Sequence, residues 1–196
     1  MGRMPVLFVG HGSPMNAIEE NEWSRGFSAL ASLVPSPVAI LAVSAHWESD
    51  GTFTTLDDPL ATIHDFGGFP PELYAMRYPA PGDPALATRA ATLAGGSAAD
   101  GRGLDHGVWS VLHRMYPAVD VPVVQLSLDV RATAGEHLAL GRALAPLRDE
   151  GVLILASGNL THDLRDAFGR LRRGDLATPD WAARFDAGVA LSLIHI

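Results

Sequence analysis

The sequence contains no cysteine among its 196 residues. This absence excludes disulfides, cysteine-ligated zinc sites, iron–sulfur clusters and a cysteine nucleophile. A metal site in this chain would therefore have to use histidine, aspartate or glutamate side chains, and the sequence offers eight histidines for that purpose.

Positive charge is also scarce, because 14 lysine and arginine residues face 22 aspartate and glutamate residues, giving a formal net charge of −8. Nucleic-acid binding relies on cationic side chains that neutralise phosphates. We therefore expect no nucleic-acid partner. The short basic run Arg170–Arg173 is interpreted as the solvated end of a helix.

Long apolar runs are missing as well. The longest, such as Val152–Ala156, are far too short to span a bilayer, and no signal-peptide pattern opens the sequence. We therefore expect a cytoplasmic protein without a membrane partner, either a monomer or a homodimer. The composition, 47% hydrophobic and 18% charged, is that of an ordinary globular chain long enough for one sizeable domain.

Short apolar runs alternate with segments of helical character. Continuous apolar runs of this length are typical of strands covered on both faces, and strands that alternate with helices predict an α/β domain with a largely parallel sheet. The four predicted strands are Pro5–Gly10, Val38–Ser44, Pro122–Leu128 and Val152–Ser157. The predicted helices are Glu22–Val34, Thr133–Leu147 with a capping box at its start, and one that begins near Pro179.

Two segments depart from this alternation. The stretch Asp57–Asp83 is rich in proline and glycine, and such long irregular loops are usually lids or pocket walls. Near the end of the chain, the apolar helix runs on without a C-cap signal. We expect residues 1–190 to form a single catalytic domain that is incomplete at its C-terminus, and residues 191–196 to be an atypical tail in which His195 has no role.

Three histidines follow predicted strands, namely His11, His46 and His162. The carboxyl ends of parallel strands share one edge of a sheet, so these side chains can meet in one cleft. Neutral imidazole is a good ligand for zinc and ferrous iron. The pattern alone predicts a metal-dependent α/β enzyme, and it leaves open that each histidine is an ordinary hydrogen-bonded loop residue.

The remaining histidines are harder to interpret. His106 precedes a predicted short helix with Asp105 as a candidate N-cap, so it either points to the cleft or covers the helix start. His113 and His137 lie in probable helices and are interpreted as structural. His64, in the proline- and glycine-rich loop, is left undecided.

Five motifs in order resemble those of the 4,5-DOPA extradiol dioxygenase-like family, which belongs to the class III, or LigB-type, extradiol dioxygenases. The resemblance runs from Val6 to about Phe185, and five ordered motifs over that length are far more specific than a single glycine-rich pattern. The motifs are Gly10–Pro14, Ser44–Trp47, His64–Pro70, Gly103–Trp109 and Ser157–His162.

The resemblance implies a three-layer α/β/α sandwich around a largely parallel or mixed sheet, with one Fe²⁺ or Zn²⁺ ion per chain. It assigns the metal to His11 and His46, acid/base catalysis to His162 and a substrate-contacting role to His106. The implied partners are a small catechol-type aromatic and dioxygen. Further side chains within these motifs are expected to contact the substrate: Ser13, Phe69, Asn159 and Thr161.

The resemblance also implies a third metal ligand, a histidine near the C-terminus, and no segment of this sequence matches it. We therefore expect weak metal binding by this chain. Two other functions fit the same histidines: a zinc-dependent hydrolase that activates water, and a non-catalytic metal-binding protein of the same fold.

Overall fold

The computed structural model describes residues 2–194, so His195 and Ile196 of the expected tail lie outside the described residues. The chain forms two compact units, divided between Leu160 and Thr161. Within the described part, no helix has the length and apolar character needed to cross a membrane.

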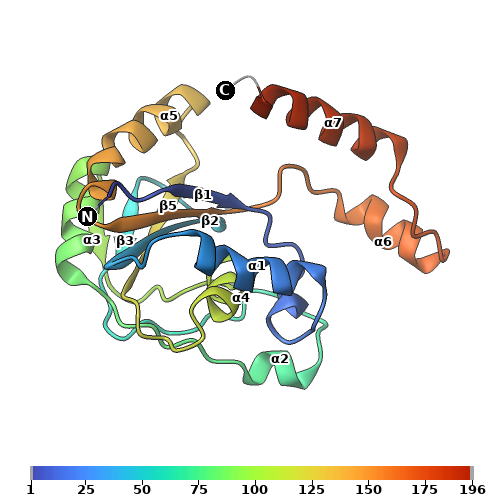
Figure 1. Cartoon of the computed structure of the whole chain (residues 1–196), viewed down its shortest axis with the longest axis horizontal. Coiled ribbons are helices and arrows are strands. Elements are labelled where there is room, and N and C mark those ends of the chain that lie inside the picture. Colours follow the sequence, from blue (N-terminus) through green and yellow to red (C-terminus); the bar gives the residue numbers. More distant parts are fainter. Residues whose placement is uncertain (1, 195–196) are drawn as a thin grey trace. The chain divides into compact units, whose positions relative to one another are not determined.

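The first unit is built on one mixed sheet (Figure 1), which over the described residues has six strands in the order β1-β6-β2-β5-β3-β4. The pairs β1–β6, β6–β2 and β2–β5 are parallel. β3 is antiparallel to β5, and β4 is parallel to β3. The strands are β1 Val6–Val9, β2 Ala39–Ser49, β3 Phe53–Thr55, β4 Ser97–Ala99, β5 Val123–Asp129 and β6 Val152–Ser157.

Helices cover both faces of this sheet, which confirms the three-layer α/β/α prediction (Figure 1). Alternate strand residues point to opposite faces. Ile40 and Leu153 pack in the core beneath α1 (Glu22–Leu33) and α4 (His106–Met115). The residues next to them in the strands, such as Leu41 and Ile154, face a second core on the opposite side of the sheet. Three helices cover this core: α3 Pro84–Ala94, α5 Ala134–Ala143 and the 3-10 helix η2 Ala145–Arg148.

Two helical predictions need correction. The segment predicted as one helix up to Leu147 divides into α5 and η2, and Pro146 explains the break because it lacks an N–H and its ring clashes with the carbonyl of Arg142. The irregular stretch from Asp57 contains a short helix, α2 (Pro71–Ala75). The capping box that opens α5 is present, with Thr133 and Glu136 as its members.

The second unit contains α6 (Leu164–Arg172) and α7 (Asp180–Ile194). The side chain of Asp163 accepts the Asp166 N–H and caps α6. The basic run ends this helix as predicted, and Arg170 pairs with Asp166 at 3.2 Å and with Asp175 at 2.6 Å. α7 begins directly after Pro179, where the sequence predicts it.

Candidate metal centre

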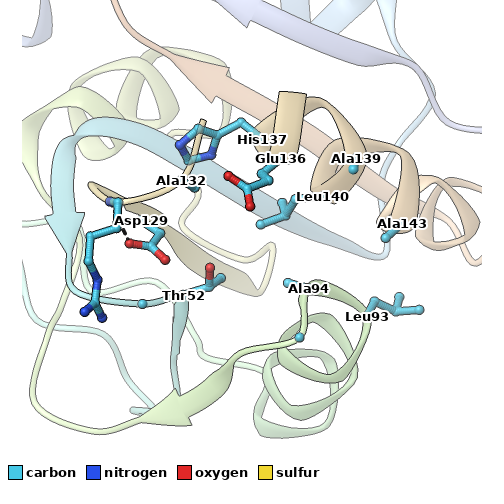
Figure 2. Close-up of a pocket in the computed structure, with 13 residues that line it drawn as sticks. Thr52, Leu93, Ala94, Asp129, Ala132, Glu136, His137, Ala139, Leu140 and Ala143 are labelled. Carbon is cyan, nitrogen blue, oxygen red and sulfur yellow. Dashed lines mark hydrogen bonds between the residues drawn. The ribbon is translucent and has the colours of Figure 1, made fainter. Parts of the chain in front are cut away.

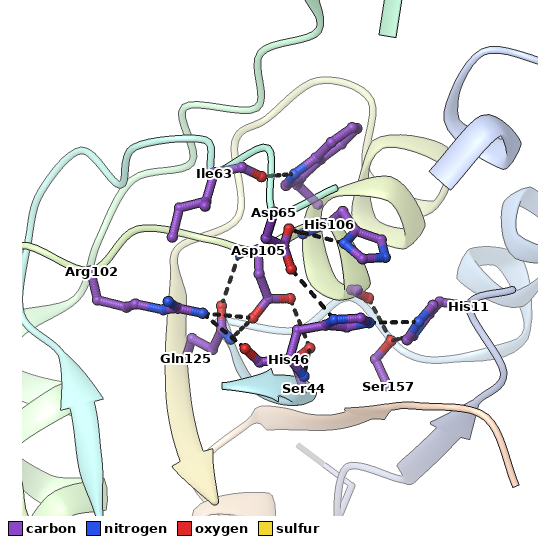
Figure 3. A network of polar contacts seen from close by, with 12 residues as sticks. His11, Ser44, His46, Ile63, Asp65, Arg102, Asp105, His106, Gln125 and Ser157 are labelled. Carbon is purple, nitrogen blue, oxygen red and sulfur yellow. Dashed lines mark hydrogen bonds and ion pairs between the residues drawn. The ribbon is translucent and has the colours of Figure 1, made fainter. Parts of the chain in front are cut away.

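Three imidazoles converge at one edge of the sheet (Figure 3): His11, His46 and His106. One ligand atom from each lies within 4.8 Å of the others, and the Nε2 atoms of His11 and His46 are 3.1 Å apart. His11 and His106 are buried, whereas His46 is exposed. The group is therefore fixed on one side by the core and open to a small molecule on the other.

His11 is set by the turn that follows β1. Gly12 adopts a φ of +64°, a left-handed conformation that favours glycine. The Asn16 side chain donates to the His11 carbonyl at 3.0 Å, and the Gly12 N–H donates to Asn159 Oδ1 at 3.3 Å. The turn is thus held from both sides, and Asn159 joins the end of β6 to it.

The hydrogen bonds of Ser157 determine the tautomer of His11. The Ser157 hydroxyl donates its single proton to the Gly107 carbonyl. Its Oγ, 2.9 Å from His11 Nδ1, must then accept the Nδ1–H of that ring. The lone pair of His11 is consequently on Nε2, the atom that faces His46.

His46 does not follow β2 as predicted but lies inside it. β2 continues to Ser49 through an irregularity in its pairing with β5: the register moves from Val43 to Glu48 on β2 while β5 moves only from Leu126 to Leu128. Such bulges re-aim side chains and are common beside active sites. The bulged segment carries His46, and its shape cannot be inferred from an apolar run that stops at Ser44.

His106 is the first residue of α4, and Asp105 occupies the N-cap position, but the Asp105 side chain does not cap the helix. This corrects the predicted cap. The carboxylate is fully buried and instead accepts hydrogen bonds from Ser44 Oγ at 2.7 Å and from Gln125 Nε2. Arg102 lies 3.4 Å away and compensates the buried charge.

Gly107 allows α4 to approach β2. A Cβ at this position would lie 2.6 Å from Ser44 Oγ, 3.1 Å from His46 Cδ2 and 3.2 Å from Asp105 Oδ1. Each of these distances is shorter than an ordinary van der Waals contact. The glycine after His106 therefore lets two of the three histidines come together.

Asp65 reaches this group from the irregular loop. Its Oδ1 lies 2.9 Å from both the Nδ1 and the backbone N of His106, and its Oδ2 lies 3.4 Å from His46 Nδ1. Partial burial acts to raise the pKa of the Asp65 carboxyl, but the hydrogen bonds that it accepts from the side chain and the backbone of His106 outweigh burial and lower the pKa to about 2. Asp65 is therefore ionised at neutral pH.

The ring nitrogens of His11 and His46 have a separation that fits a single metal ion, and His106 lies beside them. Two nitrogens bound to one ion at about 2.0–2.2 Å, at angles of roughly 90–110°, are separated by about 2.8–3.6 Å. The 3.1 Å between His11 Nε2 and His46 Nε2 falls in this range. An all-imidazole donor set suits zinc and ferrous iron alike, so the site does not by itself select between them.

Aromatic rings surround the His106 side of the group. The centroid of Phe66 lies 5.5 Å from that of His106, 5.2 Å from that of Phe69 and 5.3 Å from that of Tyr74. All three aromatic residues belong to the loop from Asp57 to Asp83. The predicted contact residue Phe69 thus packs against Phe66, and the ring of Phe66 in turn contacts the ring of His106.

The other predicted site residues lie in different surroundings. The Ser13 hydroxyl accepts the Met15 N–H and caps the 3-10 helix η1 (Pro14–Ala17). Thr161 and His162 belong to the second unit, and their roles remain predictions. His64, undecided from sequence, has its Nε2 3.1 Å from the Met76 carbonyl.

A separate hollow of about 670 Å³ lies between α3 and α5 (Figure 2). It is on the face of the sheet opposite α4, and His137 is one of its lining residues. Its polar side chains have local partners, since Glu136 completes the α5 capping box and Arg131 pairs with Asp50. This hollow is thus distinct from the histidine group.

The sequence interpretation missed Asp65, and it did not assign Ser157 a partner. Both belong to the recognised motifs, but their side chains act on residues distant in sequence: Asp65 on His106, 41 residues away, and Ser157 on His11, 146 residues away. A search for carboxylates within the histidine-containing motifs would have found Asp65.

Residues 6–193 match the family model described as the catalytic LigB subunit of aromatic ring-opening dioxygenase. The chain belongs to this family. This LigB-type chain is 47% identical over 195 residues to a protein of Escherichia coli (strain K12) and 44% identical over 201 residues to one of Beta vulgaris, both named 4,5-DOPA dioxygenase extradiol. The alignments cover 97% of this chain in each case, and 71% and 73% of the relatives.

The LigB-type fold is also found in a solved structure. The crystal structure of an uncharacterized Escherichia coli K12 protein superposes with a TM-score of 0.69 at 46% sequence identity. The superposition covers 83% of this LigB-type chain but 63% of the other. This chain thus spans less than two thirds of that solved structure.

Proposed function

We propose that this protein is an extradiol dioxygenase that opens a catechol-type, DOPA-like ring with one Fe²⁺ or Zn²⁺ ion per chain. The observation that carries the proposal is the convergence of His11, His46 and His106 at the strand edge in a LigB-type chain. The names of the two relatives described above support an aromatic diol as substrate.

His11 and His46 would hold the metal ion. When bound, the ion would supply a positive centre with open positions where a catecholate and dioxygen can meet. His106, whose ligand atom belongs to the same group, would contact the substrate beside it. Because His106 is buried at the first position of α4 and hydrogen-bonded by Asp65, it would orient the substrate without a large change in its own conformation.

Proton transfer is assigned to His162. It would accept a proton from a substrate hydroxyl, the role of a positioned general base. Phe66 and Phe69 would wall the ring-binding space, since aromatic edges pack favourably against a planar substrate. Ser13, Asn159 and Thr161 are proposed as polar contacts to the substrate.

The function is tested by oxygen uptake. Purified protein loaded with Fe²⁺, and separately with Zn²⁺, is given L-DOPA, catechol and protocatechuate in an oxygen-electrode cell, with the ring-opened product followed by its absorbance. We expect the Fe²⁺-loaded protein to consume one dioxygen per substrate opened, because Zn²⁺ has no redox chemistry of its own, and we expect no uptake by a His46→Ala control.

Two outcomes would overturn the proposal. Hydrolysis of ester or amide substrates without oxygen uptake would indicate a zinc hydrolase. Tight metal binding with neither activity would indicate a metal-binding protein that retains the fold.

Size-exclusion chromatography with light scattering would decide between monomer and homodimer.

A further inference from the structure

Asp65 is the only carboxylate that contacts two of the three histidines among residues 2–194 (Figure 3). Its two oxygens have different partners. Oδ1 faces the ring and the backbone N–H of His106, both at 2.9 Å, and Oδ2 faces the ring of His46 at 3.4 Å. In both histidines the nitrogen that faces Asp65 is Nδ1, not Nε2.

An ionised carboxylate can only accept hydrogen bonds. The nitrogen that points to it must therefore carry the hydrogen, so His106 and His46 are both favoured as Nδ1–H tautomers. The lone pair of each ring is then on Nε2. Because His11 has the same tautomer through Ser157, all three rings present an acceptor Nε2 to the group.

The surroundings of Asp65 suit this task. The carboxylate lies at the N-terminus of α4, where it accepts the first backbone N–H of the helix, and negative charge is stabilised at that end. Its side chain is 22% exposed, so its hydrogen bonds are only partly screened by water. The contacts to His106 are therefore short and well supported.

We propose that Asp65 is a positioning residue that serves two imidazoles at once, orienting His46 as a metal ligand and His106 beside the same ion. This inference rests on the proposed function, because it assumes that the histidine group holds a metal. Hydrogen-bonded carboxylates that orient metal-bound histidines raise their basicity and sharpen the geometry of the site. Here one side chain would do so for two rings.

The first test is metal affinity in Asp65→Asn. Asparagine keeps the size of the side chain and can still accept from one ring, but its amide nitrogen donates hydrogen bonds. A ring that faces the amide would take the Nε2–H tautomer, which cannot ligate. We expect Zn²⁺ and Co²⁺ affinity, measured by competition with a chromophoric chelator, to fall by roughly 10- to 100-fold. The visible spectrum of the Co²⁺ protein should change as well.

The matched control is Asp58→Asn, which removes the same charge from the same loop. Asp58 accepts the Gly82 N–H at 2.9 Å, and no contact of Asp58 with the histidine group is found in the described structure. We expect its metal affinity to stay within about twofold of wild type. Equal affinity in Asp65→Asn and wild type would overturn the role of Asp65 and leave the proposed function intact. Absence of metal binding in the wild type would overturn both.

A second measurement does not depend on the stability of Asp65→Asn. Long-range proton–nitrogen correlation spectra of the wild-type protein distinguish Nδ1–H from Nε2–H imidazoles, and His46→Gln and His106→Gln provide the assignments. We expect the Nδ1–H form for both rings. Finding the Nε2–H form for both would contradict the proposal even if Asp65→Asn were unstable.

Discussion

Replacing Gly107 by alanine tests whether the approach of α4 to β2 builds the histidine group. The added Cβ would lie 2.6 Å from Ser44 Oγ and 3.1 Å from His46 Cδ2, whereas ordinary contacts begin near 3.4 Å. Ser44 is fully buried and donates to Asp105 at 2.7 Å. The hydroxyl can therefore move away only if this hydrogen bond lengthens or breaks.

The expected cost has two parts. Overpacking a filled core costs about 1–3 kcal/mol, and loss of a hydrogen bond to a charged group costs about 1.5–3 kcal/mol. We therefore expect Gly107→Ala to lower the free energy of unfolding by roughly 2–5 kcal/mol. Because the same Cβ presses on His46, metal affinity should fall together with stability.

The assay is denaturation by urea in the presence of a chelator, so that bound metal does not add to the stability of either protein. Gly141→Ala is the matched control, because Gly141 lies inside α5 and a Cβ there meets nothing within 4 Å. Alanine should stabilise that helix by about 0.5–1 kcal/mol. If Gly107→Ala changed stability by less than about 0.5 kcal/mol, the close approach would not be a constraint and the reasoning would be wrong.

Three further predictions concern the site and the core. In a metal-loaded protein, His162→Ala should keep its metal while ring cleavage falls by roughly 10²–10⁴-fold, whereas His46→Ala should lose the metal. Elemental analysis and oxygen uptake of each variant distinguish the two roles. Metal loss in both variants would make His162 a ligand. Ser157→Ala removes the acceptor of the His11 Nδ1–H and should weaken Zn²⁺ binding in chelator competition, while Ser157→Thr, which keeps the hydroxyl, should retain more of it. Leu153→Ala, at a fully buried position, should cost about 2–5 kcal/mol in urea denaturation, and a much smaller loss would mean that the core relaxes into the space.

The central strands could be predicted from sequence because both of their faces are buried. β6 has the predicted bounds, Val152–Ser157, since a strand covered on both sides reads as an unbroken apolar run. β3 and β4 could not be predicted in the same way. Each has three residues, too few to show a period, and their pairing depends on contacts made only in the folded chain.

The sequence predicts those site residues that lie at the carboxyl ends of the parallel strands. His11 follows β1, and parallel strands bring their carboxyl ends to one edge, which is why its place near His46 follows from the sequence. The bulge that contains His46 and the approach of Asp65 to the histidines do not follow from the sequence. They depend on the register between β2 and β5 and on the path of a long loop, and neither leaves a local pattern in the sequence.

A loop residue can position a metal ligand only if the loop itself is held, and the contacts around Ile63 supply this support. The Ile63 N–H donates to the Leu104 carbonyl at 2.8 Å, and its own carbonyl accepts the Trp109 Nε1–H at 2.8 Å. Leu104 and Trp109 flank His106 in sequence and are fully buried. The loop is thus fastened to both sides of the helix start two residues before Asp65. Sites on helices and strands are usually more precise than sites on loops. Here the two hydrogen bonds of the Ile63 backbone hold the Asp65 carboxylate in position as a helix or strand would.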